Sequence, residues 1–146
     1  MKVYFGTDHG GYELKEELKR YVVSLGYEVV DKGALTLDPE DDYPDFVIPA
    51  AEAVASDSGS LGIVLGRSGN GEQIAANKIK VIRAALCVNT TMAQKAREHN
   101  HANVLSIGAD YTDPEEVKKI VKTFLETPYS DEERHQRRID KIMNYD

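Results

Sequence analysis

The segment from Gly66 to Glu72 has the composition of a ligand-binding loop. Three of its first six residues are glycines, which let backbone N–H groups approach a ligand closely. A helix predicted from Glu72 to Lys78 would point its positive dipole end at the same place, so the pattern predicts a cradle for negative charge. A tight strand-to-helix turn explains the same glycines on steric grounds alone. The spacing fits neither a nucleotide-triphosphate loop nor the dinucleotide fingerprint.

Glu72 adds a reactive group to this loop. A carboxylate in the first turn of a helix commonly only complements the helix dipole. Here it would also stand beside the cradle, where it could remove a proton from a ligand. Glu72 is therefore a candidate general base.

Asp8 and His9 come directly after the first predicted strand and precede two glycines. An acid and an imidazole at the carboxyl end of a strand suit contacts to the hydroxyl and phosphate groups of a substrate. The alternative is that Asp8 caps the following helix and His9 is a solvated loop residue.

Two further groups lie in the last third of the chain. His99 and Asn100 follow a predicted helix, where a histidine often only complements the dipole. A metal site is less favoured, because His99 and His101 are two residues apart and have no carboxylate partner at ligand spacing. Arg134 and Arg138 stand at i and i+4, so both guanidinium groups can reach one phosphate dianion. The alternative is a solvated basic face that balances the acidic residues just before it.

Length and composition indicate a single domain, residues 1–146. Hydrophobic residues make up 41% and charged residues 29%, and no apolar run approaches the roughly 18 residues of a membrane helix. The one cysteine, Cys87, excludes an internal disulfide framework. A net charge of −7 disfavours nucleic acid and anionic membranes as partners. The N-terminus lacks signal-peptide anatomy, so we expect a cytoplasmic protein.

Short β-branched runs alternate with stretches of helical spacing, which predicts a parallel sheet with crossover helices. The predicted strands are 2–6, 27–31, 61–66, 82–88 and 103–107. We predict a three-layer, doubly wound α/β fold with the flavodoxin-like strand order 2-1-3-4-5 and a C-terminal helix. Ligands bind such sheets beyond the carboxyl ends of the strands, where the order reverses. The loops after the first and third strands would then share one cleft.

The helices that must carry these loops have recognisable spacing and ends. Besides 72–78, apolar spacing predicts helices over 14–25 (ended by Gly26), 46–56 and 91–98, a helix opened by Asp113 and Pro114, and a C-terminal helix opened by a Ser130–Glu133 capping box.

Several segments together resemble one enzyme family. They are Asp8-His9-Gly10-Gly11-Tyr12, Asp42-Tyr43-Pro44, Gly66-x-Ser68-Gly69-Asn70-Gly71 with Ile74-Ala75-Ala76-Asn77-Lys78, Arg83-Ala84, His99-Asn100-x-x-Asn103-Val104-Leu105 and Arg134-His135-x-x-Arg138. In this order, over essentially the whole chain, the sequence resembles the type B ribose-5-phosphate isomerases, a family that also includes the galactose-6-phosphate isomerase subunits.

The resemblance implies an aldose–ketose isomerase that acts through an enediolate, without a metal or cofactor. It implies that Asp8 assists at the sugar hydroxyls and that His99 opens the furanose ring. Ser68 is expected to act with these residues, as one of the groups that stabilise the enediolate oxygen. The substrate-binding residues expected are His9, Tyr43, Arg67, Gly69, Asn70, Gly71, Asn100, Arg134 and Arg138.

The resemblance also assigns the base. Many members use a cysteine at the position matched by Gly66, and that cysteine is absent here. The chain resembles instead the subgroup in which a glutamate takes the role, so Glu72 is the expected base. Cys87 is expected to be a buried apolar residue.

Two positions depart from the family pattern. Asp110 stands where the family usually has a phosphate-binding arginine, and an acid there would repel phosphate. Arg67 stands where the family commonly has glycine. We therefore expect Arg67 to offset the missing arginine or to contact a different group of the substrate.

The predicted topology bears on assembly. His99 and Asn100 follow a helix antiparallel to the strands, so they should emerge at the amino edge of the sheet, opposite the Asp8 and Gly66 loops. We expect a homodimer in which these residues complete the partner's cleft, and a small sugar phosphate as the ligand. The alternatives are an isomerase of another pentose or hexose, or a non-catalytic flavin- or phosphate-binding module on the same sheet.

Overall fold

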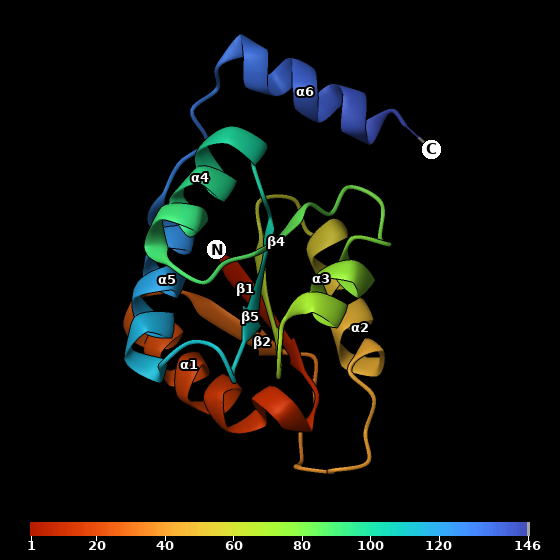
Figure 1. Cartoon of the computed structure of the whole chain (residues 1–146), viewed down its shortest axis with the longest axis vertical. Coiled ribbons are helices and arrows are strands. Elements are labelled where there is room, and N and C mark those ends of the chain that lie inside the picture. The colour runs from red at the N-terminus through yellow and green to blue at the C-terminus, as the bar shows by residue number, and fades with distance from the viewer. Residues whose placement is uncertain (146) are drawn as a thin grey trace.

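Five parallel strands form one central sheet in the computed structural model, which describes residues 1–145 (Figure 1). The strands are β1 (Lys2–Thr7), β2 (Glu28–Asp31), β3 (Leu61–Gly66), β4 (Ala84–Leu86) and β5 (Val104–Gly108). Their order is β2-β1-β3-β5-β4, and every neighbouring pair is parallel. The predicted three-layer α/β class is confirmed.

The last two strands are exchanged relative to the predicted order 2-1-3-4-5. β5 is buried along its whole length and pairs with β3 on one side and β4 on the other. β4 has only three residues, of which two are half-buried, and it forms the sheet edge. A central place suits the longer, fully buried strand, because a parallel strand is covered on both faces there. β1 and β3 remain neighbours, so the switch point is where it was predicted.

Helices cover both faces of this sheet. They are α1 (Tyr12–Ser24), α2 (Pro44–Ala55), α3 (Asn70–Ala76), α4 (Thr90–Asn100) and α5 (Pro114–Glu126), with a short 3₁₀ helix at His9–Gly11. The last helix, α6 (Glu133–Met143), lies beyond the end of the sheet, beside α4 (Figure 1). One core lies between the sheet and α1, α4 and α5, and a second between the sheet and α2 and α3 (Figure 1). Within residues 1–145, no helix is both long enough and apolar enough to cross a membrane.

The helix ends confirm one of the predicted capping residues and contradict another. Asp113 caps α5, because its Oδ2 accepts a hydrogen bond from the Glu115 N–H at 3.1 Å, with Pro114 in the first turn as predicted. The capping box predicted for the last helix is wrong. The Ser130 hydroxyl instead donates to the Glu98 carbonyl at 2.7 Å, and α6 begins at Glu133 without a side-chain cap. Ser130 therefore ties the start of α6 to the end of α4.

A buried ion pair anchors the segment between β2 and α2. The fully buried Lys15 donates to both carboxylate oxygens of Asp31, at 2.8 and 2.7 Å, and also to the Ala34 carbonyl. Burial alone would raise the pKa of Asp31, but hydrogen bonds from Lys15, Lys19 and the Gly33 N–H outweigh it and lower that pKa. This anchor holds the following loop against the carboxyl end of β1.

Candidate active site

Two loops meet at the carboxyl ends of β1 and β3. Asp8 follows β1 and accepts a hydrogen bond from the Gly10 N–H at 2.9 Å, so it caps the short 3₁₀ helix that precedes α1. Arg67 follows β3, and its backbone and side chain pack directly against Gly10. The two loops predicted to share a cleft are therefore in contact. Capping, the alternative function considered for Asp8, is also present.

Glu72 is buried beside this contact. It lies in the first turn of α3, is 4% exposed, and has one carboxylate oxygen, Oε1, that is buried without a hydrogen-bond partner among residues 1–145. Burial raises the pKa of Glu72 above its ordinary value, and the negative charge of Asp8 raises it further. A desolvated carboxylate with a raised pKa is a stronger proton acceptor than one in water.

Gly66 is the reason that this carboxylate fits. A Cβ added at position 66 would overlap the Glu72 carboxylate itself. The Glu72 side chain therefore occupies the space that any side chain at position 66 would need. By the resemblance described above, position 66 is where many relatives carry a cysteine base, and here a carboxylate reaches the same space from position 72.

The loop between these two residues is held on the sheet and on α2. Gly69 has a left-handed backbone conformation (φ 82°) at the N-terminus of α3, and its carbonyl accepts a hydrogen bond from the buried Ser106 hydroxyl at 2.7 Å. Ser68 Oγ accepts from the Asn70 N–H at 3.1 Å. The Tyr43 phenol packs directly against Gly71. Tyr43 and the residues from Ser68 to Gly71 thus line one side of the Glu72 site.

Arg67 and Asp110 contact each other through both their side chains and their backbones. Their side chains form an ion pair at 3.6 Å, and the Asp110 N–H donates to the Arg67 carbonyl at 3.0 Å. Arg67 also lines a cavity of about 480 Å³ together with His9, Ala109 and Pro114. Arg67 therefore places a guanidinium group next to Asp110, at the edge of this cavity.

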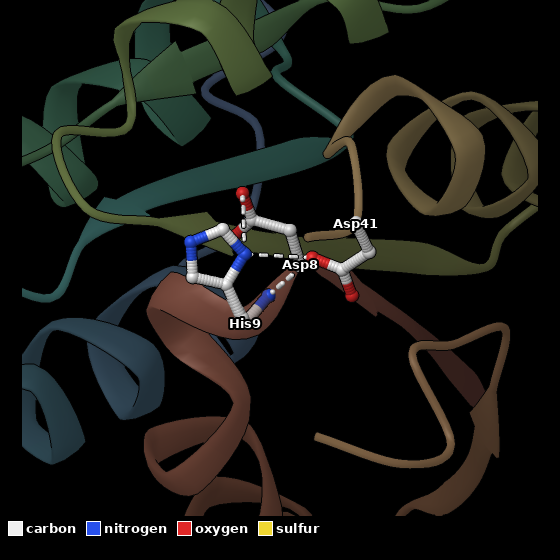
Figure 2. Close-up of side chains that lie close together, drawn as sticks. All are labelled: Asp8, His9 and Asp41. Carbon is white, nitrogen blue, oxygen red and sulfur yellow. Dashed lines mark hydrogen bonds and ion pairs between the residues drawn. The ribbon is translucent and has the colours of Figure 1, made fainter. Parts of the chain in front are cut away.

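His9 is held by an aspartate that sequence reasoning missed. His9 Nδ1 lies 2.7 Å from Asp41 Oδ1, and the His9 backbone N–H donates to the same oxygen at 3.0 Å (Figure 2). Asp8, His9 and Asp41 each place one donor atom within 4.8 Å of the others, which is also the composition of a cation site. Hydrogen bonds from His9 to Asp41, and from Gly10 to Asp8, already account for this arrangement.

The remaining predicted site residues lie at the other end of the sheet. His99 and Asn100 end α4, and the His99 ring stacks on the buried His135 ring of α6 with centroids 4.2 Å apart. Arg134 and Arg138 project from the exposed surface of α6, where Arg134 lies 3.5 Å from Glu132. Figure 1 shows α6 beside the end of α4, far from the carboxyl ends of the strands.

The predicted site is therefore divided. One half, at the carboxyl edge, has a buried carboxylate, an imidazole, an arginine and a turn of backbone amides. The other half, at the amino edge, has His99, Asn100 and two exposed arginines. Proton transfer and anion binding are the chemistry these groups provide together. The fold and the carboxyl-edge site define a doubly wound α/β enzyme with a buried carboxylate, that of Glu72, at its switch point.

Comparison with known proteins identifies the family. The family model described as Ribose/Galactose Isomerase matches residues 3–142. Ribose-5-phosphate isomerase B of Mycobacterium tuberculosis H37Rv is 50% identical over 146 residues, which cover 100% of this chain and 90% of that protein. The type B ribose 5-phosphate isomerase structure from Trypanosoma brucei superposes with a TM-score of 0.95 at 43% identity, covering 99% of this chain and 98% of that one.

A ligand-bound structure is also similar. Ribose-5-phosphate isomerase B from Mycoplasma genitalium, with bound ribulose-5-phosphate, superposes with a TM-score of 0.95 at 39% identity and covers 99% of this chain and 95% of that chain. The chain belongs to the Ribose/Galactose Isomerase family.

Proposed function

We propose that this protein interconverts D-ribose 5-phosphate and D-ribulose 5-phosphate through an enediolate. The observation that carries the proposal is the buried Glu72 carboxylate beside the Gly66 turn. The M. tuberculosis relative and the ribulose-5-phosphate complex from M. genitalium support the substrate. A flavin-binding module would leave Glu72 without a role, and the family membership speaks against it.

The chemistry assigns one task to each group. Moving a proton between C1 and C2 requires one base that reaches both carbons, and Glu72 is the buried carboxylate at the cleft. The enediolate oxygen needs donors that are in place before the reaction, which the turn from Ser68 to Gly71 supplies. Asp8 accepts hydrogen bonds from the sugar hydroxyls. The protein acts on a small metabolite, and we place it in the cytoplasm.

A direct assay tests this function. Purified protein incubated with ribose 5-phosphate is expected to form ribulose 5-phosphate, measured by the absorbance of the ketose or by NMR. The same assay with aldohexose 6-phosphates tests the alternative substrate, which Asp110 and the family's galactose members make worth measuring. Absence of conversion with every aldose phosphate would contradict the proposal.

The divided site leads us to propose a homodimer that shares its active sites. Ring opening by His99 and phosphate binding by Arg134 and Arg138 require these groups near Glu72, and a single chain holds them at the opposite end of the sheet. A second copy of the chain, placed with its amino edge against the first one's cleft, supplies them.

A groove on the amino-edge side offers a surface for this second copy. It has a volume of about 870 Å³ and lies between α6, the edge strand β4 and the segment before it. Ile142, Met143 and Val81 line it and are exposed to solvent in the single chain, at 56%, 37% and 54%. Burying apolar side chains of this kind stabilises association by about 25 cal/mol per Å² of surface removed from water, before the costs of ordering.

Mixed dimers give a quantitative test of the shared site. Glu72→Gln and His99→Asn subunits are each expected to be nearly inactive as homodimers. If they are combined in equal amounts by co-expression, half of the dimers are mixed and each has one intact site, so about a quarter of wild-type activity should return. The ribose 5-phosphate assay measures this recovery.

The two variants separately, at the same total concentration, are the controls for this experiment. Activity of the co-expressed sample that stays at the average of the two variants, with mixed dimers verified by native mass spectrometry, would show that each chain builds its own site. A strict monomer with full wild-type activity would have the same meaning.

Arg67 is proposed to replace the phosphate contact that Asp110 cannot make. Arg67→Ala is expected to raise KM for ribose 5-phosphate roughly tenfold with a smaller change in kcat, because a charge-assisted contact to the substrate is lost. Asp110→Asn is expected to lower KM, since it releases Arg67 from the ion pair at 3.6 Å. Arg20→Ala, an exposed arginine on α1, is the control. An unchanged KM in Arg67→Ala would refute the role.

A further inference from the structure

Asp41 holds His9 through two hydrogen bonds to a single oxygen. Asp41 Oδ1 accepts from the His9 backbone N–H at 3.0 Å and lies 2.7 Å from the ring atom Nδ1 (Figure 2). The two residues are far apart in sequence: His9 begins the 3₁₀ helix after β1, and Asp41 lies in the loop before α2. The contact therefore fixes both the backbone and the ring of His9.

This contact decides which ring nitrogen is free. An ionised aspartate has no proton to donate. In a hydrogen bond with the ionised Asp41, the His9 Nδ1 must therefore carry the proton. The nitrogen left for a ligand is Nε2, which lies on the side of the ring away from Asp41 (Figure 2). His9 lines the cavity of about 480 Å³ that it shares with Arg67, so an anion in this cavity would have an imidazole and a guanidinium to bind.

Asp41 also favours the protonated form of His9. The Asp41 side chain is only 9% exposed, and its second oxygen, Oδ2, is buried without a hydrogen-bond partner among residues 1–145. Its negative charge is therefore directed largely at the imidazole. The hydrogen bond to Asp41 raises the pKa of His9 above its ordinary value.

The other charged groups around His9 have smaller or opposing effects. Burial of the ring lowers the pKa of His9, Asp8 raises it from 4.0 Å away, and Arg67 lowers it. Glu13 and Glu17 of α1 line the same cavity. Asp41 is the acid in direct contact with the ring.

We propose that Asp41 is a positioning residue that presents His9 to the substrate phosphate as a cation, with Nδ1 bound to Asp41 and Nε2 directed at the ligand. The phosphate in this statement rests on the proposed function; the pairing of Asp41 with His9 does not. Asp41 itself need not touch the substrate. The effect of Asp41 on phosphate binding should therefore be largest at the pH values at which Asp41 changes the protonation of His9.

The test compares Asp41→Asn with the wild-type protein. Asparagine retains an oxygen that can accept both hydrogen bonds, so the loop keeps its anchor while the charge is removed. ¹⁵N-detected NMR of the imidazole, with His9→Gln to assign the signals, gives the tautomer and the titration midpoint of His9. We expect the wild-type ring to remain protonated to a higher pH than in Asp41→Asn, and its neutral form to carry the proton on Nδ1.

Phosphate binding provides the second readout. Inorganic phosphate is titrated into both proteins at pH 6 and pH 8. At pH 6 a larger share of His9 is protonated in both proteins than at pH 8, so their affinities should be closer to each other there. At pH 8 the affinity of Asp41→Asn should fall further below that of the wild type than at pH 6, by up to roughly tenfold, because the wild-type His9 keeps its proton to a higher pH. Glu40→Gln, which removes an exposed charge from the neighbouring residue, is the matched control and should follow the wild type.

Three outcomes would overturn the proposal. They are an unchanged His9 midpoint in Asp41→Asn, a loss of phosphate affinity that is the same at both pH values, or an equal effect in Glu40→Gln. Thermal unfolding of each variant shows whether it is folded. The imidazole titration needs no substrate, so it tests the Asp41–His9 pairing even if the assay detects no isomerase activity.

Discussion

Glu72→Gln is expected to lower kcat for ribose 5-phosphate by about 10³-fold, because the removal of a general base costs roughly two to four orders of magnitude. Glutamine has nearly the same size and can stay in the space beside Gly66, so substrate binding should be retained. In deuterated water, the wild-type enzyme should introduce deuterium at C1 or C2 of the sugar, and the variant almost none. Exchange is followed by NMR.

Glu72→Gln should lower kcat but raise the thermal stability of the protein at neutral pH. Burial raises the pKa of Glu72, so its contribution to stability is fully present below the ordinary glutamate pKa and is lost as pH rises through the raised value. At neutral pH the wild-type protein has therefore lost part of the stability that the protonated Glu72 carboxyl contributes at low pH. Glu72→Gln should unfold at a higher temperature than the wild type at pH 7, with the difference shrinking near pH 4.

Glu115→Gln is the matched control, since Glu115 is an exposed glutamate in the first turn of another helix, α5. Glu115→Gln should leave deuterium exchange into the sugar unchanged, and it should not raise the unfolding temperature at pH 7. Deuterium exchange that survives in Glu72→Gln would move the base to another residue.

Gly66→Ala is expected to reduce kcat by about 10²-fold or more while costing little stability. The added methyl group would occupy the position of the Glu72 carboxylate, which lies at the end of a flexible side chain and can move away. The backbone of β3 therefore stays in place, and the base leaves its position. A displacement of about 1 Å in a reacting group commonly costs two orders of magnitude in rate. Steady-state kinetics and thermal unfolding measure the two effects.

Gly62→Ala on the same strand provides the opposite control. A Cβ at position 62 would lie 2.9 Å from a methyl group of Val54 and 3.2 Å from one of Val104, within a packed core. Overpacking of this kind costs roughly 1–3 kcal/mol, so this variant should lose stability and keep its kcat. If Gly66→Ala were fully active, the position of Glu72 could not matter to catalysis.

Local patterns predicted much of this fold. The apolar spacing of α5 and its Asp113–Pro114 start were visible in a few neighbouring residues, as were the strands β1 and β3 with the loops that follow them. These features depend on contacts close in sequence or on periodicity. The switch point could be predicted for the same reason, because β1 and β3 carry the two unusual loops.

Features that depend on distant contacts could not be predicted in this way. No local signal shows that β5 rather than β4 takes the central place, since both are short apolar runs. The capping-box spacing at Ser130 was genuine, but its hydroxyl is used by the carbonyl of Glu98, which is 32 residues earlier.

The candidate site shows the same limit. Asp41 lies among several acidic residues in the loop before α2, and nothing in its neighbours distinguishes it from Asp38 or Asp42. Its importance comes from contact with His9, which is 32 residues away in the chain. Residue type and position after a strand were enough to select His9, whereas its supporting group appears only in three dimensions.

The separation of the site into carboxyl-edge and amino-edge halves has a consequence for enzyme behaviour in dilute solution. Under the proposed assembly a lone subunit holds no complete site, so activity follows the law of mass action for association. Far above the dissociation constant of the dimer, the rate is proportional to enzyme concentration. Far below it, the rate falls with the square of the concentration. The abundance of the protein would then regulate the activity of each molecule.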